Sequence, residues 1–301
     1  MSLKKVIVIA GPTASGKTGL SVALAKKLNT LVLSADSRQF YKELSIGTAK
    51  PTASEMDGVE HLFIDSHSVE EEVSVSKFIT QAEPILLESL NNHDTVVLTG
   101  GSGMFIDSLL YGLDEIPHSL ELRNELNEFV KENGTSELQK EIREKDPTYY
   151  WEMDIHNPLR VMRAVEVMRL TGKKYSELRK RSKKEQPFEI HYFVIEHPRD
   201  ELYARIDQRV DVMLESGLLE EVKTLLPFKH LQSLKTVGYT ELFDYLEGNS
   251  TLEFAIDKIK QNSRNYAKRQ LTWFKRNPEA IKIPFQEVNE MCEFVQNEID
   301  K

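Results

Sequence analysis

The sequence predicts an α/β fold in which a parallel sheet is flanked by helices and carries an all-helical insertion. Residues 6–10, 30–35 and 95–99 are short apolar runs with many β-branched residues, a pattern typical of buried strands. Residues 18–28 place leucine and alanine at helical spacing soon after the first run, and a helical pattern also follows the third. Strands that alternate with helices favour a parallel sheet with helices on both faces.

A long interruption separates these strands from the next strand candidate, residues 191–195. The interruption is charged, helical in its pattern and poor in strand signals, which indicates an all-helical insertion between strands of one sheet. We therefore predict a core formed by residues 1–116 and 188–301, ending in helices, and a helical insertion over residues 117–187.

Composition and charge distribution narrow the class of protein. The 301 residues are 40% hydrophobic and 29% charged, as in globular proteins, and no apolar run approaches the roughly 20 residues that span a bilayer. The single cysteine, Cys292, excludes an internal disulfide, so we expect a cytoplasmic protein with no membrane partner. The net charge of −9 disfavours nucleic acid, yet residues 160–184 carry ten basic side chains and residues 258–276 carry seven. Such local fields attract a polyanion.

The most specific motif lies between the first predicted strand and the helix after it. Eight consecutive residues match the phosphate-binding P-loop pattern: Gly11, Pro12, Thr13, Ala14, Ser15, Gly16, Lys17 and Thr18. Its glycines let successive N–H groups turn towards an anion, while the helix N-terminus and Lys17 add positive charge. Thr18 offers a hydroxyl to Mg²⁺. The core is therefore predicted to be P-loop NTPase-like and to bind a phosphate compound.

The motif alone leaves the phosphate compound open. ATP is the commonest ligand of such loops, so a P-loop small-molecule kinase using ATP is one interpretation. Asp36 follows the second predicted strand, where it could organise Mg²⁺ or act as a general base. A GTPase-like switch is disfavoured because the sequence lacks the guanine-reading motif Asn/Thr-Lys-x-Asp. The eight histidines show no metal-ligand spacing, so no structural zinc site is expected.

Six further segments follow the P-loop in order along the chain: residues 36–41, 46–51, 100–105, 157–167, 237–239 and 266–274. Together with the P-loop they span residues 11–274 and resemble the tRNA dimethylallyltransferase (tRNA isopentenyltransferase) family. Two blocks are far more selective than the P-loop, namely Gly47-Thr48-Ala49-Lys50-Pro51 and Lys268-Arg269-Gln270-Leu271-Thr272-Trp273.

The resemblance implies transfer of a dimethylallyl group from dimethylallyl diphosphate to N6 of the adenosine 3′-adjacent to the anticodon in tRNA. The P-loop, Lys17 and Mg²⁺ would stabilise the leaving diphosphate, and Asp36 would accept a proton from the weakly nucleophilic amine. Ser102 stands where the family usually has threonine, near the acceptor base. Arg205 would help to hold the diphosphate, although Arg209, one helical turn away, could substitute.

The resemblance also implies a set of tRNA-contacting positions. These are Asp36, Ser37, Arg38, Gln39, Ser102, Arg123, Leu159, Arg160, Val161, Met162 and Arg163. The family often has glutamine at the place of Leu159, so one polar contact would be lost there. We expect the insertion to clasp the anticodon stem-loop of tRNA and the protein to be a monomer. A channel would admit the diphosphate at one mouth and the flipped adenine at the other.

The second basic segment, residues 258–276, interleaves Tyr266, Trp273 and Phe274 with its charges. Aromatic rings in such a segment could stack on unpaired bases, but we expect Trp273 and Phe274 to pack partly in the core. Prenylation of free adenine nucleotides is an alternative to tRNA that the insertion and the basic helices disfavour.

Overall fold

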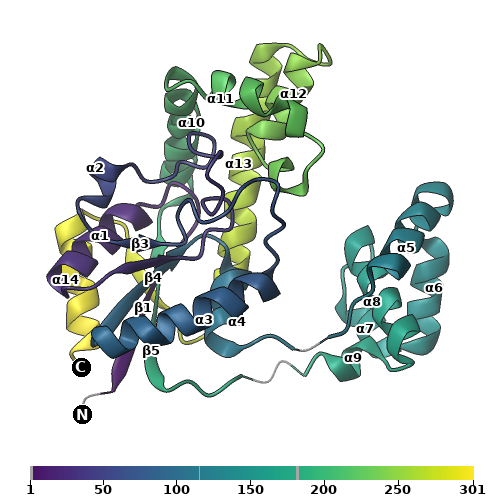
Figure 1. The fold of residues 1–301 in the computed structure, drawn as a ribbon, viewed down its shortest axis with the longest axis horizontal. Helices are drawn as coiled ribbons and strands as arrows, with labels where there is room; N and C mark the ends of the chain where they lie inside the picture. Colours follow the sequence, from purple (N-terminus) through teal and green to yellow (C-terminus); the bar gives the residue numbers. More distant parts are fainter. Residues whose placement is uncertain (1–2, 115, 181–182) are drawn as a thin grey trace. The chain divides into compact units, whose positions relative to one another are not determined.

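The computed structural model describes residues 3–114, 116–180 and 183–301, and these form two compact units (Figure 1). One unit is Met1–Leu110 together with Glu185–Lys301, and the other is Tyr111–Lys184. Arg181, one of the ten basic residues in the segment 160–184, lies outside the described residues.

The first unit is built on a parallel sheet. The described residues give it six strands in the order β3-β2-β4-β1-β5-β6. The strands are β1 (Lys4–Ala10), β2 (Val32–Ser34), β3 (His61–Leu62), β4 (Thr95–Gly100), β5 (Phe188–Glu196) and β6 (Ile281–Pro284). The predicted α/β fold and its four strands are confirmed. The edge strands β3 and β6 were not predicted, because two and four residues are too short to show a strand pattern.

Helices cover both faces of this sheet (Figure 1). Because successive strand residues point to opposite faces, Ile7 and Ile9 share one face of β1, where they pack with α1 (Lys17–Lys27) and α14 (Val288–Ile299). Val6 and Val8, also fully buried, point to the other face. There α3 (Val75–Asn92) packs on β4. The ring centroids of Phe78 on α3 and Phe105 on α4 (Gly103–Tyr111) lie 5.4 Å apart.

The C-terminal part of this unit adds a helical layer with its own core. Its elements are α10 (Arg199–Glu215), α11 (Leu218–Leu225), η1 (Leu226–Phe228), η2 (Gln232–Leu234), α12 (Tyr239–Leu246) and α13 (Leu252–Phe274). Short helix α2 (Ala53–Met56) follows β2 in the chain. The longest of these helices, α13, packs on both α10 and α12, and its lower end descends to the sheet (Figure 1). It therefore brings residues from the end of the chain to the strand ends.

The second unit is helical throughout its described residues. Its helices are α5 (Leu120–Asn133), α6 (Ser136–Lys145), α7 (Pro147–Glu152), α8 (Pro158–Thr171) and α9 (Tyr175–Leu178). They enclose a separate core with Leu126, Ile142 and Val165 at its centre. The all-helical insertion is thus confirmed as part of the fold class. Within the described residues, no helix in either unit is long and apolar enough to cross a bilayer.

Candidate active site

The phosphate loop occupies the turn between the end of β1 at Ala10 and the start of α1 at Lys17. Ala14 (φ 62°) and Gly16 (φ 89°) adopt left-handed conformations, which curl the backbone at the helix N-terminus. The Ser15 hydroxyl is buried and has no hydrogen-bond partner among the described residues. A curled backbone with an unsatisfied buried hydroxyl suits a bound anion.

Lys17 is the cation at the base of this loop. Its ammonium donates a hydrogen bond to the Pro12 carbonyl at 2.7 Å, which points the charge back into the loop. Burial lowers the pKa of Lys17 to about 8; the negative charge of Asp36 acts against this shift and the positive charge of Arg209 adds to it. Lys17, Asp36 and Arg209 are therefore close enough to influence one another.

Two arginines of α10 face the same region. Arg205 donates from Nε to the Ala14 carbonyl at 2.9 Å, and its guanidinium lies 4.6 Å from the ring centroid of Phe285. Arg209 donates to the Thr48 carbonyl, and burial lowers its pKa while the Asp36 charge acts to raise it. The two arginines therefore hold different places: Arg205 is attached to the phosphate loop, and Arg209 lies between that loop and the segment around Thr48.

Asp36 and Ser102 lie at the same edge of the sheet because they follow β2 and β4, which are neighbouring parallel strands. The Asp36 carboxylate accepts the Arg38 backbone N–H at 3.2 Å. The Ser102 hydroxyl accepts the Ser37 backbone N–H at 3.2 Å and lies 3.1 Å from the Ser37 hydroxyl. Both groups thus lie at the same carboxyl edge of the sheet as the phosphate loop.

Tyr266 of α13 completes the surroundings of Ser102. Burial raises the pKa of Tyr266 to about 12, the nearby Asp36 charge adds to this, and a hydrogen bond with Ser102 acts against it. The phenol is therefore neutral near pH 7. Within the second basic segment, Tyr266 lies in the site, whereas Phe274 is buried and Trp273 donates to Asp107 at 2.6 Å. The predicted core packing of Trp273 and Phe274 is confirmed.

The segment that contains Thr48 is anchored by one carboxylate from α11. Glu221 accepts the backbone N–H groups of Ser45, Ile46 and Gly47 at 2.8–3.1 Å, and it also accepts the Tyr239 hydroxyl. Gly47 is required here, since a Cβ atom at that position would lie 2.5 Å from the Tyr239 ring. The anchored segment in turn presents the Thr48 carbonyl to both Arg209 and Gln39.

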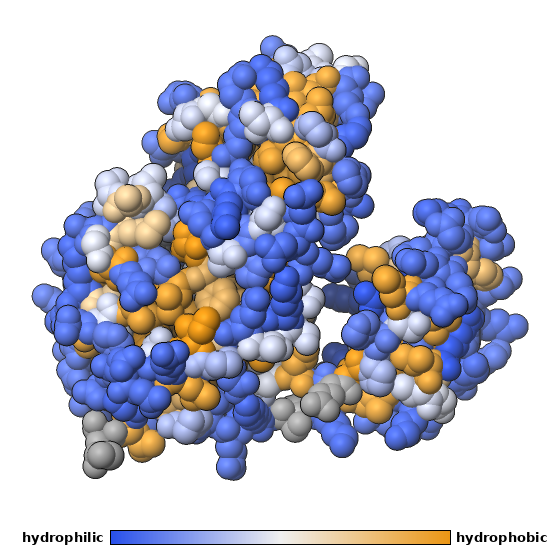
Figure 2. Space-filling view, in the orientation of Figure 1, coloured by the Kyte–Doolittle hydropathy of each residue, from blue (hydrophilic) through white to orange (hydrophobic). Residues whose placement is uncertain are grey.

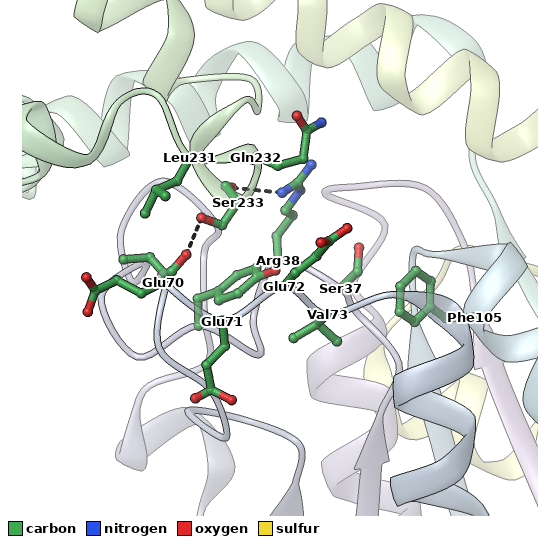
Figure 3. Close-up of a pocket in the computed structure, with 12 residues that line it drawn as sticks. Ser37, Arg38, Glu70, Glu71, Glu72, Val73, Phe105, Leu231, Gln232 and Ser233 are labelled. Atoms are coloured by element: carbon green, nitrogen blue, oxygen red, sulfur yellow. Dashed lines mark hydrogen bonds between the residues drawn. The ribbon is translucent and has the colours of Figure 1, made fainter. Parts of the chain in front are cut away.

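A cavity of about 400 Å³ lies beside the segment that follows Asp36 (Figure 3). Ser37 and Arg38 line it together with segments 69–73 and 231–233. Arg38 donates to the Ser233 carbonyl at 2.8 Å across this cavity (Figure 3). Its lining includes no phosphate-loop residue, so this cavity does not trace the predicted channel between two mouths.

The predicted tRNA contacts of the insertion differ in accessibility. Leu159 is 72% exposed and Arg160 is exposed, whereas Val161 and Met162 are buried in the core of this unit. The side chains of Val161 and Met162 therefore pack in the core of the helical unit, and the tRNA contacts expected at these two positions stay a prediction.

Arg123 and Arg163 are both paired with the buried carboxylate of Glu166. The nitrogen–oxygen distances are 3.2 Å from Arg123 and 3.0 Å from Arg163. Arg163 also donates to the carbonyls of Ile116 and Pro117. These bonds fix both guanidinium groups at the surface of α5 and α8. The space-filling view shows a mostly hydrophilic surface with separate apolar patches (Figure 2).

The sequence did not reveal several residues that build the site. Glu221 and Phe285 depend on contacts between distant segments, and no local pattern marks them. Gln270 could have been found, because it lies inside one of the two selective blocks.

Comparison with known proteins decides the family. A family model described as IPP transferase matches residues 39–277. The tRNA dimethylallyltransferase of Cytophaga hutchinsonii is 44% identical over 299 residues, which cover 99% of this chain and 98% of that protein. The chain belongs to this family. The predicted family and the assignment to the prenyltransferases are confirmed, and a small-molecule kinase is not favoured.

Solved structures of tRNA dimethylallyltransferase family members agree. A full-length tRNA isopentenylpyrophosphate transferase from Bacillus halodurans has a TM-score of 0.73 at 38% identity, covering 99% of this chain and 96% of that one. A eukaryotic dimethylallyltransferase acting on tRNA has a TM-score of 0.81 at 25% identity, covering 98% of this chain and 77% of that one. The P-loop NTPase-like core predicted from the sequence is confirmed by this likeness.

Proposed function

We propose that this family member transfers a dimethylallyl group from dimethylallyl diphosphate to N6 of the adenosine 3′-adjacent to the anticodon of tRNA. One observation carries the proposal: an anion loop with Lys17 and the Asp36–Ser102 pair share one edge of the sheet. The first group of residues suits a diphosphate, and the second suits an amine that must lose a proton.

The reaction forms a bond between N6 and the first carbon of the dimethylallyl group and breaks the bond from that carbon to the diphosphate oxygen. Backbone N–H groups of the phosphate loop, Lys17 and Arg205 stabilise the charge of the departing diphosphate. Asp36 accepts the proton that N6 loses, a step worth about 10²–10⁴-fold in rate. Ser102, held by Ser37, orients the amine.

The residues at the loop fit a magnesium ion that is bound largely by the diphosphate. The described residues contain no cluster of three histidine, cysteine or carboxylate side chains that could hold a metal alone. The Thr18 hydroxyl, at the start of α1, would be one protein ligand of such an ion, since Mg²⁺ ordinarily takes its other ligands from phosphate oxygens and water. When bound, the ion would neutralise charge on the leaving group.

On the RNA side, Arg38, Gln39 and the exposed residues Leu159 and Arg160 are proposed to contact the anticodon stem-loop. Arg123 and Arg163 are proposed to meet its phosphates while remaining paired with Glu166. Such contacts position the RNA without reading its sequence. The reaction is proposed to take place in the cytoplasm, and the protein is proposed to act as a monomer.

The test offers the protein bulk tRNA with either labelled dimethylallyl diphosphate or γ-labelled ATP, each with Mg²⁺. We expect the prenyl label to enter tRNA and the phosphate label to enter no acceptor. Replacing tRNA by adenosine monophosphate separates the tRNA reaction from prenylation of free nucleotides. Phosphate transfer from ATP, or prenylation of the mononucleotide in preference to tRNA, would overturn the proposal.

A further inference from the structure

Gln270 joins two loops that are distant in sequence. Its side chain lies on α13 and is only 5% exposed. The amide oxygen accepts the Thr13 backbone N–H at 2.8 Å, and the amide nitrogen donates to the Gly101 carbonyl at 2.9 Å. Both ends of the amide are used, so its orientation is fixed by its partners.

The two loops belong to the two halves of the site. Thr13 lies in the phosphate loop, and Gly101 directly precedes Ser102. The backbone pairing of β1 with β4 ends at Ala10 and Gly100. Beyond that pair the strand ladder no longer holds the loops in register, and the Gln270 side chain bridges them instead.

The fit around this amide is close. A Cβ atom at Gly101 would lie 2.3 Å from the Gln270 amide nitrogen and 3.6 Å from an Asp36 carboxylate oxygen. Glycine is therefore required at position 101 for α13 to approach the sheet. The amide thus lies beside the carboxylate assigned to proton transfer.

We propose that Gln270 is a positioning residue that sets the spacing between the diphosphate loop and Ser102. This inference rests on the proposed function, because it assigns the two loops to donor and acceptor. A displacement of about 1 Å between reacting groups can cost about 10²-fold in rate, so a single amide that bridges both loops controls turnover without touching substrate.

The experiment compares Gln270→Met with a matched control, Gln261→Met. Gln261 lies on the same helix but is exposed and bonds only Lys258 among the described residues. We expect kcat to fall about 30- to 100-fold in Gln270→Met, with little change in KM for tRNA and none in the control. Ser102→Ala is then added to both the wild type and Gln270→Met. If Gln270 acts by placing Ser102, the Ser102→Ala effect shrinks in the Gln270→Met background; if the two effects multiply, the inference is wrong.

A readout independent of turnover separates this inference from the proposed function. The Thr13 amide exchanges with solvent more slowly when it is bonded to Gln270, so we expect at least tenfold faster exchange in Gln270→Met. Gln270→Glu keeps an oxygen that can accept the Thr13 N–H but loses the amide nitrogen that donates to the Gly101 carbonyl. Hydrogen exchange at Thr13 should therefore stay slow in this variant, while kcat still falls. Unchanged Thr13 exchange in Gln270→Met would overturn the bridge, even in a protein that failed to prenylate tRNA.

Discussion

Raising the pH from 7 to 9 should weaken the binding of inorganic pyrophosphate about tenfold through the protein alone, apart from the ionisation of the ligand itself. The reason is Lys17, whose pKa burial lowers from 10.5 to about 8. Only the protonated form carries the charge that holds the anion. The protonated fraction is about 0.9 at pH 7 and about 0.1 at pH 9, a loss worth about 1.4 kcal/mol of binding free energy.

The assay is isothermal titration with pyrophosphate at fixed Mg²⁺, on the wild type and on Lys17→Arg. An arginine keeps its charge over this range, so Lys17→Arg should show only the pH dependence of the ligand itself. The ratio of the two Kd values removes that shared part and should change about tenfold between pH 7 and 9. A ratio that stays constant would refute the assignment of Lys17 as the buried cation of the anion site.

Asp36→Asn should lower kcat by about 10²–10⁴-fold while leaving the Kd for tRNA within a few-fold of wild type, as measured by single-turnover kinetics and filter binding; normal turnover would show that Asp36 is not the base. Glu221→Ala removes the acceptor of three backbone N–H groups and should lower the free energy of unfolding by about 2–3 kcal/mol in urea titration. Gly47→Ala would bring a methyl group against Tyr239 and should lower the free energy of unfolding by about 1–3 kcal/mol in the same titration. Unchanged stability would contradict this close contact. Glu166→Ala leaves Arg123 and Arg163 without their buried partner, so the melting temperature should fall. The affinity for tRNA should also fall, and by more than it falls in Glu144→Ala, a control that removes an exposed carboxylate of the same unit.

Local pattern was enough to predict four of the six strands and the phosphate loop between the first strand and its helix. The P-loop is a contiguous motif, and its place between a strand and a helix fixes its conformation. Asp36 and Ser102 lie at one edge of the sheet because each follows a strand of that parallel sheet, and the carboxyl ends of such strands share an edge.

Contacts made by long-range packing could not be predicted. Glu221 bonds residues more than 170 positions earlier in the chain, and Gln270 joins loops 169 and 257 positions away. No periodicity encodes such partners. For Arg163, the sequence predicted a tRNA contact but did not indicate that a buried carboxylate on the same helix binds its guanidinium.

The most direct test of the central claim is mass analysis of the anticodon loop after incubation with the protein, Mg²⁺ and dimethylallyl diphosphate. We predict a gain of one C5H8 unit on N6 of the adenosine 3′-adjacent to the anticodon, and its loss with Asp36→Asn. An unmodified loop with the wild-type protein, or modification of another nucleotide, would contradict the assignment of the phosphate loop and Asp36 to one reaction.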